Sequence, residues 1–446
     1  MKSAVALTLA TAASAIVIPE ALDGFTRLKD EIKHTLEDIP SHIHDSLKEA
    51  GEQFSAELAS AIKTKLENDE FFSGDTVDDE PADYNIDIQG GDFSDLTIYE
   101  LISKSNHTKK FFELVGEHDK VVKLLNDTEA NYTLFAPLDE AFEHVPHDKK
   151  PNDDFIENVL KYHVGLGEYP AGRILHTHTL PTAFDEPWLG DKPQRLRTSV
   201  GWGGVRVNVY SKVVAVNFKA KNGWIHAVNR ILVPPPMIGR EISLFPAQFS
   251  TLLLAYDKTD FVKFVHNVKM IGSTVFAPSN EAWQRLGPKA NAFLFNTEKG
   301  KKYLKALLKY QIVPNTTVYS DEIYYGDEDA EKNAKKRSKN LKTTGNFHIE
   351  LPTLLEEKSV GVDIHSWKGW TSIVVNGAVA VGFQDAIGKN GVIQVVKNVP
   401  IPPYKKQPHA SVIDGEIEVE DLMERLQDYV EVEEDEDESQ DWDGEL

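Results

Sequence analysis

The sequence contains no cysteine among its 446 residues. This absence excludes disulfide frameworks, thiolate metal sites and cysteine nucleophiles. Positive charge is also scarce, because 48 basic residues stand against 71 acidic ones and the formal net charge is −23. A nucleic-acid-binding protein needs a positive surface against the phosphates, so no nucleic-acid partner is expected. With 41% hydrophobic residues the chain can bury substantial cores, and its length predicts about two to four domains.

Long apolar runs are missing too, apart from one at the N-terminus. Lys2 precedes a mostly apolar run over residues 4–18, which is shorter than the roughly 20 residues of a spanning helix. Ala13-Ser14-Ala15 fits a small-residue cleavage site, so we predict a secretory signal peptide over residues 1–15. The alternative is an N-terminal membrane anchor. After cleavage of the signal peptide, no spanning membrane segment is expected.

Entry into the secretory pathway gives a meaning to four Asn-x-Ser/Thr triplets, none of which has proline in the middle. Such asparagines accept glycans if they are exposed, and we expect some of them to be used. The glycosylation candidates are Asn106, Asn126, Asn131 and Asn315.

The two flanks of the chain differ in composition from its middle. Residues 20–72 have apolar residues at spacings of three and four, which predicts a helical N-terminal segment. This segment either packs on its own domain or binds a partner or a membrane surface. An acidic linker over residues 73–94 follows, and residues 404–446 form an acidic C-terminal tail. Runs of like charge are typical of solvated segments.

The acidic tail also contains an apolar stripe at helical spacing, which predicts a helix. This helix either docks on the protein's own surface or binds a partner. The stripe consists of Val419, Leu422, Met423, Leu426 and Val430.

The middle of the chain contains an internal repeat. Residues 133–142 read Thr-Leu-Phe-Ala-Pro-Leu-Asp-Glu-Ala-Phe, and residues 274–283 read Thr-Val-Phe-Ala-Pro-Ser-Asn-Glu-Ala-Trp. Leu-Lys-Tyr then occurs in both copies, and each copy closes with an Asn-Gly segment, at 222–232 and 390–400. The pattern predicts a strand ended by proline, then helices, then a strand-rich half closed by a hairpin at Asn-Gly. The aromatic residues Phe135 and Phe276 of the first strands are expected to be buried.

These ordered motifs, each present twice, resemble the fasciclin-type adhesion domain. The resemblance covers residues 95–236 and 240–403, and we expect two separate folding units joined at Pro234–Gly239. It implies an α+β fold in which each domain is a β-sandwich-like wedge with clustered helices. It also implies a secreted, non-enzymatic cell-adhesion or cell-surface protein that binds a cell-surface or matrix protein or a polysaccharide. The alternative is a lumenal protein of the vacuole or another secretory compartment that acts in membrane trafficking or fusion.

The Tyr-His motif of the family is complete only in the first copy, as Tyr162-His163, because the second copy has Tyr310-Gln311. The resemblance connects this region with integrin contact in animal members. Tyr162 and His163 are therefore candidates for an adhesion surface in the first domain. The alternative is that both side chains pack and form hydrogen bonds inside the domain.

Motifs for catalysis or cofactor binding are missing from the sequence: there is no Gly-x-Ser-x-Gly, no phosphate loop and no His-Glu-x-x-His. We therefore predict no enzymatic activity, no metal and no cofactor. One basic cluster lies in an insertion of the second copy, and it either meets an anionic polysaccharide or lipid headgroup or is a solvated loop. The cluster consists of Lys332, Lys335, Lys336, Arg337, Lys339 and Lys342.

Overall fold

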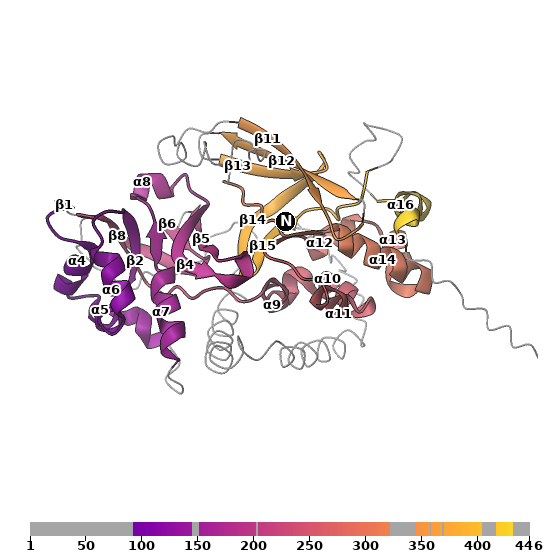
Figure 1. The fold of residues 1–446 in the computed structure, drawn as a ribbon. Coiled ribbons are helices and arrows are strands. Elements are labelled where there is room, and N and C mark those ends of the chain that lie inside the picture. Colours follow the sequence, from indigo (N-terminus) through magenta and orange to yellow (C-terminus); the bar gives the residue numbers. More distant parts are fainter. Residues whose placement is uncertain are drawn as a thin grey trace, which may run out of the picture.

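A computed structural model describes residues 92–144, 151–201, 204–321, 345–356, 358–367, 370–403 and 416–430. The predicted signal peptide, the helical segment 20–72, nearly all of the acidic linker, the basic cluster and both ends of the acidic tail lie outside these residues. The described residues form two domains that lie side by side (Figure 1). No helix in this part of the chain is long and apolar enough to span a bilayer.

Domain 1 combines a group of helices with a strand-rich second half. Its helices are α4 (Ile98–Lys104), α5 (Lys109–Gly116), α6 (Asp119–Asn126), the 3-10 helix η2 (Asp139–His144), α7 (Asp153–Tyr162), α8 (Ala171–Ile174) and the 3-10 helix η3 (Pro187–Leu189). Its strands are β1 (Asp92–Phe93), β2 (Tyr132–Pro137), β3 (Val164–Leu166), β4 (Thr179–Glu186), β5 (Lys192–Gly201), β6 (Gly204–Val207), β7 (Ser211–Ala220) and β8 (Gly223–Val228).

Domain 2 repeats this order with more helix. Its helices are α9 (Ile238–Leu244), α10 (Pro246–Lys258), α11 (Phe261–His266), α12 (Asn280–Arg285), α13 (Pro288–Asn296), α14 (Glu298–Tyr310), α16 (Val419–Leu426) and the 3-10 helix η4 (Gln427–Tyr429). Its strands are β9 (Ser273–Pro278), β10 (Ile312–Pro314), β11 (Gly345–Pro352), β12 (Ser359–Trp367), β13 (Trp370–Val375), β14 (Val379–Gly388) and β15 (Gly391–Val396).

Both sheets are mixed, and each domain combines its sheet with helices, which confirms the α+β prediction. The strand order is β1-β7-β6-β5-β4-β3-β2-β8 in domain 1, where β7 also pairs with β8 and closes the sheet into a ring. In domain 2 the order is β10-β9-β15-β14-β13-β12-β11. In each domain the strand that carries Phe-Ala-Pro runs parallel to the last strand, with Phe135 opposite His226 and Phe276 opposite Gln394. Strands β2 and β9 are buried along their whole length, which is typical of a parallel strand covered on both faces.

The predicted Asn-Gly hairpins are present between β7 and β8 and between β14 and β15. Gly223 has φ +148°, and a Cβ at this position would lie 1.9 Å from the carbonyl oxygen of Tyr132. Gly391 has φ +149° and the same approach to Ser273 at 2.0 Å. Glycine is therefore required at both turns by the close contact with the neighbouring strand as well as by its backbone angle.

The element that follows Phe-Ala-Pro differs between the copies. In domain 2 the hydroxyl of Ser279 accepts a hydrogen bond from Ala282 N–H at 3.2 Å and caps helix α12. Domain 1 has Leu138 at this point of the motif, and the chain forms the 3-10 helix η2 instead. A leucine side chain cannot satisfy the free N–H groups at a helix start, and so the predicted α-helix of domain 1 is replaced by the tighter form.

The hydrophobic cores confirm the prediction for the two motif phenylalanines, since Phe135 and Phe276 are both 0% exposed. Domain 2 has one main core cluster, whereas the core of domain 1 is divided into two main clusters, with Leu134 in one and Phe135 in the other. Neighbouring residues on β2 point to opposite faces, so this strand separates the two clusters.

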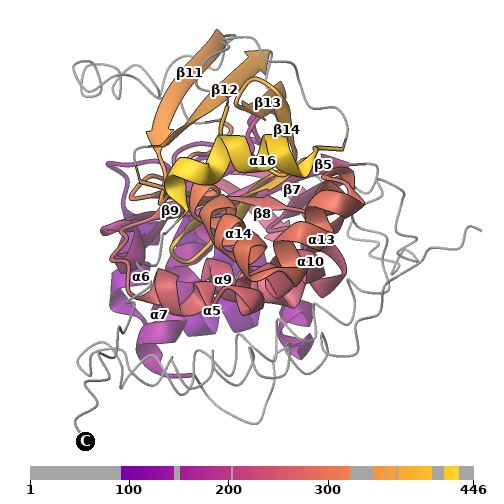
Figure 2. The same ribbon diagram turned by 90° about the vertical axis from the view of Figure 1, so that its right-hand side faces the viewer.

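The apolar stripe of the C-terminal tail forms α16, and of the two alternatives the helix docks on the protein's own surface. Leu422 and Leu426 are buried in the core of domain 2, with Met423 and Val430 packed against it. Figure 2 shows α16 lying across α13 and α14. Its approach is fixed by Ile417, whose N–H donates to the carbonyl oxygen of Leu286 at 3.1 Å.

Candidate functional site

Tyr162 and His163 lie at the end of α7, and both side chains are buried, with 0% and 1% of their surface exposed. The Tyr162 hydroxyl donates to the carbonyl oxygen of Arg195 at 2.9 Å and accepts from Asn208 Nδ2 at 2.9 Å. Burial raises the pKa of Tyr162 well above its usual value. The phenol is therefore a neutral link between α7 and the strands.

His163 forms two hydrogen bonds that fix its tautomer. Its Nδ1 lies 2.7 Å from the carbonyl oxygen of Val159, and its Nε2 accepts from Leu232 N–H at 2.9 Å. A carbonyl only accepts and an amide N–H only donates, so Nδ1 carries the proton and the ring is neutral. Burial lowers the pKa of His163 to about 4. The adhesion-surface hypothesis for Tyr162 and His163 is thus corrected: neither side chain reaches the surface, because each connects buried backbone groups.

A second buried histidine, His226 on β8, has the opposite tautomer. Its Nε2 lies 2.8 Å from the carbonyl oxygen of Tyr169, and its Nδ1 accepts from Asn217 N–H at 3.3 Å. Burial lowers the pKa of His226 to about 4 as well. The amide of Asn217 in turn accepts from Ala171 N–H at 2.8 Å. This network holds the loop between β3 and α8 against the sheet.

Domain 2 has the same network without histidine. Gln394 Nε2 donates to the carbonyl oxygen of Val318 at 2.8 Å, and its Oε1 accepts from Asp385 N–H at 3.1 Å. Asp385 stands where domain 1 has Asn217, and its Oδ1 accepts from Ser320 N–H at 2.9 Å. Burial, and then the charge of Asp321, raise the pKa of Asp385.

The Tyr-Gln version of the motif differs at the second residue. Gln311 is buried, and its Nε2 has no hydrogen-bond partner among the described residues. In domain 1 the N–H of Leu232 donates to His163, whereas the aligned residue in domain 2 is Pro400, which has no N–H. The change from histidine to glutamine therefore coincides with the loss of the backbone N–H from which the histidine accepts a hydrogen bond.

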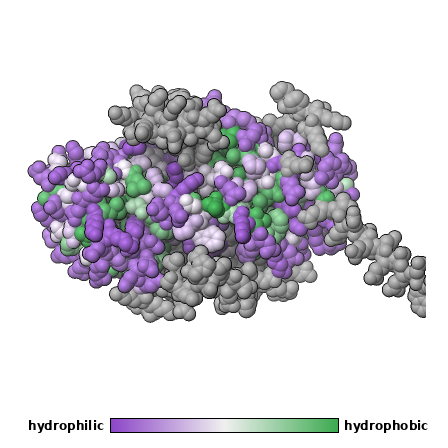
Figure 3. Space-filling model, viewed as in Figure 1, coloured by the Kyte–Doolittle hydropathy of each residue, from purple (hydrophilic) through white to green (hydrophobic). Residues whose placement is uncertain are grey.

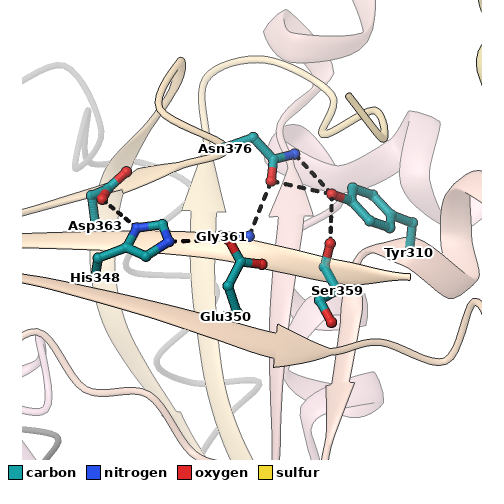
Figure 4. A network of polar contacts seen from close by, with 7 residues as sticks. All are labelled: Tyr310, His348, Glu350, Ser359, Gly361, Asp363 and Asn376. Carbon is teal, nitrogen blue, oxygen red and sulfur yellow. Dashed lines mark hydrogen bonds and ion pairs between the residues drawn. The ribbon is translucent and has the colours of Figure 1, made fainter. Parts of the chain in front are cut away.

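One polar group in domain 2 was not found from the sequence. Figure 4 shows His348 on β11 between two carboxylates, with Nδ1 2.7 Å from Asp363 on β12 and Nε2 3.0 Å from Glu350. Hydrogen bonds to Asp363 and then Glu350 raise the pKa of His348. The sequence shows that His348 and Glu350 lie on the same face of a strand. It does not show that Asp363 lies opposite them, because the register of the two strands is set only in the folded sheet.

Beside this exposed group lies a second set of hydrogen bonds, which includes the buried motif tyrosine Tyr310 (Figure 4). Gly361, on β12, lies beside Glu350, and a Cβ there would come within 3.0 Å of the Glu350 carboxylate. Its N–H donates to Asn376 Oδ1 at 3.2 Å, and Asn376 Nδ2 donates to the Tyr310 hydroxyl at 2.9 Å. The charged group and the end of α14 thus lie close together, because Gly361 pairs opposite Glu350 in the sheet.

The surface of the described residues is largely hydrophilic, with small scattered hydrophobic areas on the face drawn in Figure 3. The four asparagines of the Asn-x-Ser/Thr triplets, Asn106, Asn126, Asn131 and Asn315, are all exposed. No group of three or more histidine, aspartate or glutamate side chains in the described ranges is arranged to hold a metal ion. The features available for recognition in this part of the chain are therefore polar surfaces and exposed Asn-x-Ser/Thr triplets.

A family model described as the fasciclin domain matches the chain twice, over residues 106–234 and 247–402. Among solved structures, a FAS1 domain pair from the insect cell adhesion molecule fasciclin I aligns with 65% of this chain and 95% of that chain, at 18% identity and a TM-score of 0.32.

Three curated relatives illustrate the range of proteins that resemble this chain. Aurofusarin biosynthesis cluster protein S of Gibberella zeae is 27% identical over 363 residues, which cover 76% of this chain and 87% of that protein. Stabilin-2 of Rattus norvegicus is 25% identical over 245 residues, which cover 51% of this chain and 16% of that protein. Fasciclin-1 of Schistocerca americana is 26% identical over 281 residues, which cover 60% and 38%. The chain thus spans well under half the length of the last two.

Proposed function

Because this chain belongs to the fasciclin-domain family, we propose that it is a non-enzymatic adhesion or matrix-interaction protein of the secretory route. Its partner is a cell-surface or matrix protein or a polysaccharide. The observation that carries the proposal is that the fasciclin-domain model matches the chain twice; Fasciclin-1 of Schistocerca americana is among the relatives of the chain. The burial of the polar motif residues supports recognition by the outer surfaces.

A binding assay with the full-length chain tests this function. The secreted, tagged chain should bind intact host cells or immobilised matrix in a saturable way, and heat-unfolded chain should not. Binding of the unfolded chain at the same level would contradict recognition by folded domains. Detection of the tagged chain in the vacuole alone would favour the lumenal role in membrane trafficking or fusion.

The basic cluster is the proposed contact for an anionic polysaccharide. Charge attraction of this kind weakens as salt screens it, so binding should fall between low and physiological ionic strength. Replacing Lys335, Lys336 and Arg337 by glutamine should remove most of the salt-sensitive binding. Lys299→Gln, at an exposed lysine of α14, is the matched control, and an equal loss in that variant would contradict a specific role of the cluster.

The proposed secretory route predicts N-glycans on the exposed triplets. Glycosidase treatment should lower the apparent mass of the secreted chain, and N-terminal sequencing should place the mature start near Ile16. Asn→Gln variants at Asn106, Asn126, Asn131 and Asn315 would show which positions are used. An intact Met1 together with an unchanged mass would contradict the proposed route.

A second candidate function comes from the relative that covers 76% of this chain, which is a biosynthesis cluster protein. In this case the chain would be the accessory partner of a biosynthetic enzyme. Deletion of the gene should then change the metabolites of the host, while cell attachment stays normal. Loss of attachment with an unchanged metabolite profile would favour the adhesive function.

A further inference from the structure

The two domains touch through hydrogen bonds that connect β4 and β5 of domain 1 with domain 2. Gln194 Nε2 donates to the carbonyl oxygen of Gly388 at 3.2 Å, and Arg197 Nε donates to that of Gln384 at 2.8 Å. The Arg197 guanidinium also lies 4.2 Å from the ring centroid of Phe383. These contacts define how the domains are oriented, since each joins a side chain of one domain to a fixed backbone group or ring of the other.

The most concentrated contact is made by Asp321, which follows β10 in domain 2. Its Oδ2 accepts from the backbone N–H groups of His178 at 2.9 Å and Thr179 at 2.7 Å. Its Oδ1 accepts from the Thr179 hydroxyl at 2.7 Å. Thr179 in turn accepts from Arg195 Nη1 at 2.8 Å. One carboxylate of domain 2 thus receives three hydrogen bonds from the start of β4 in domain 1, and bonds to an ionised acceptor are stronger than neutral ones.

Asp321 is held in place from inside its own domain. The preceding residue, Ser320, donates through both its N–H and its hydroxyl to the two carboxylate oxygens of Asp385 on β14. Asp385 is 0% exposed and also accepts from Gln394 Nε2 at 2.9 Å. The path from the core of domain 2 to domain 1 therefore consists of hydrogen bonds on both sides of the Ser320–Asp321 peptide bond.

Domain 1 has the same local fold without these groups. The aligned hydrogen bond runs from Ala171 N–H to Asn217, so Ala171 corresponds to Ser320 and the following Gly172 corresponds to Asp321. A Cβ at Gly172 would meet nothing within 4 Å. The hydroxyl and both carboxylates thus occur only in the domain that has a neighbour at this edge.

From this difference we propose that Ser320, Asp321 and Asp385 form an interdomain latch that makes the two fasciclin domains move as one rigid body. The two domains have separate hydrophobic cores, and the latch fixes their relative orientation. A partner would therefore meet one continuous surface built from both domains. The proposal does not depend on the adhesive function, because it concerns the geometry of the pair alone.

The absence of cysteine makes a direct test practical, since two introduced cysteines can be spin-labelled without background. Lys123→Cys on α6 and Lys299→Cys on α14 place labels on exposed positions of the two domains. Pulsed electron-spin distance measurements on the full chain should give one narrow distribution. In Asp321→Gly, which installs the residue of domain 1, the distribution should be wider, because three of the hydrogen bonds between the domains are lost and the contacts of Gln194 and Arg197 that remain restrict the relative motion of the domains less.

Asp260→Asn is the matched control, because Asp260 is an exposed aspartate of domain 2 that pairs only with Lys263 across one turn of α11. It should leave the distribution unchanged. A broad distribution in the unsubstituted chain, or equal widths in Asp321→Gly and Asp260→Asn, would overturn the latch.

Thr179→Val tests the same contact from domain 1, so that a folding defect of Asp321→Gly cannot leave the question open. It removes one of the three hydrogen bonds to Asp321 and should give an intermediate width. Hydrogen exchange should show both cores still protected. If Thr179→Val and Asp321→Asn both give a distance distribution as narrow as that of the unsubstituted chain, the latch is overturned.

Discussion

In domain 1, His163 and His226 occupy buried positions that Gln311 and Gln394 occupy in domain 2. The geometry at the second position is nearly the same: one side-chain group donates to a loop carbonyl, and the other accepts from the N–H of a β-strand residue. An amide supplies this donor and acceptor pair at every pH, whereas a histidine supplies it only when neutral.

The comparison teaches that the two domains respond to acid in different ways. Protonation of either histidine would place an N–H against the backbone N–H that it accepts from, in addition to burying a charge. Domain 2 lacks both of these titrating groups and instead has Asp385, whose pKa is raised by burial and by Asp321. A raised carboxyl pKa favours the folded state at low pH, and this contribution is lost as the pH rises through it. The buried networks of the two domains therefore have opposite pH preferences.

The largest expected effect comes from the residue beside this network in each domain. Phe135 lies next to His226, with ring centroids 5.7 Å apart. Phe135→Ala or Phe276→Ala should cost about 3–5 kcal/mol through lost contacts and a cavity, a large part of the roughly 5–15 kcal/mol of a typical domain. Secretion level and denaturant unfolding measure the loss. Phe93→Ala, at a phenylalanine that is 41% exposed, should be nearly neutral, and a comparable loss there would contradict the cavity argument.

The next effect is the acid response itself. Both histidines have a folded pKa of about 4 against about 6.5 when unfolded, so their stabilising contribution is complete above pH 6.5 and is lost as the pH falls toward 4. Each contributes at most roughly 3 kcal/mol. Hydrogen exchange resolved by peptide should show domain 1 opening at pH 4.5 before domain 2 does.

Replacing His163 and His226 together by glutamine should reduce this difference between the domains, because the contribution of the histidines is removed and that of Asp385 remains. Domain 1 would then keep its protection to a lower pH than in the unsubstituted chain. Earlier acid opening of domain 2 in the unsubstituted chain would show that other carboxylates dominate the response.

A smaller effect is expected from α16, which is part of the core of domain 2 and has no counterpart among the described residues of domain 1. Domain 2 includes α16 in its core, and Leu422→Ala should cost about 2 kcal/mol, at the lower end for a buried leucine, because a terminal helix can shift into the space. Met423→Ala, a partly buried position of the same helix, should cost less. The unfolding midpoint measures both, and no change in Leu422→Ala would mean that α16 does not support the core in solution.

The smallest expected effect is His163→Gln at neutral pH. The substitution leaves Leu232 N–H without the acceptor that His163 Nε2 provides, and one such hydrogen bond is worth about 1 kcal/mol. The variant should be detectably less stable than the unsubstituted chain at pH 7. This difference in stability should be smaller at pH 4.5, where the unsubstituted chain has lost the benefit of the neutral ring. A loss as large as that of Phe135→Ala would mean that His163 is a main packing element.

Much of the fold follows from local patterns. Phe-Ala-Pro predicts a buried strand that ends at proline, and Asn-Gly predicts the hairpin, because each pattern restricts the backbone within a few residues. The stripe around Leu422 predicted a helix and left its docking open, because periodicity identifies an apolar face without identifying what covers it.

The candidate site was harder to predict, for a physical reason. Tyr162 and His163 each have an apolar body and a polar tip, so their type fits a surface as well as a hydrogen-bonded interior. The contact of Asp321 with Thr179 joins residues that are far apart in the chain. The sequence around Asp321 does not indicate this contact, because its partner lies in the other domain. The cluster around His348 likewise depends on a strand register that no local motif specifies.

The parallel pairing of the first motif strand with the last strand has a consequence for synthesis on the ribosome. Phe135 pairs opposite His226, and Phe276 pairs opposite Gln394, so neither sheet can be completed until almost the whole domain has left the exit tunnel. Until then, β2 or β9 is an apolar edge without its neighbour, and such edges are prone to aggregate. Nascent chains stalled just before Gly223 or Gly391 should therefore bind chaperones most strongly.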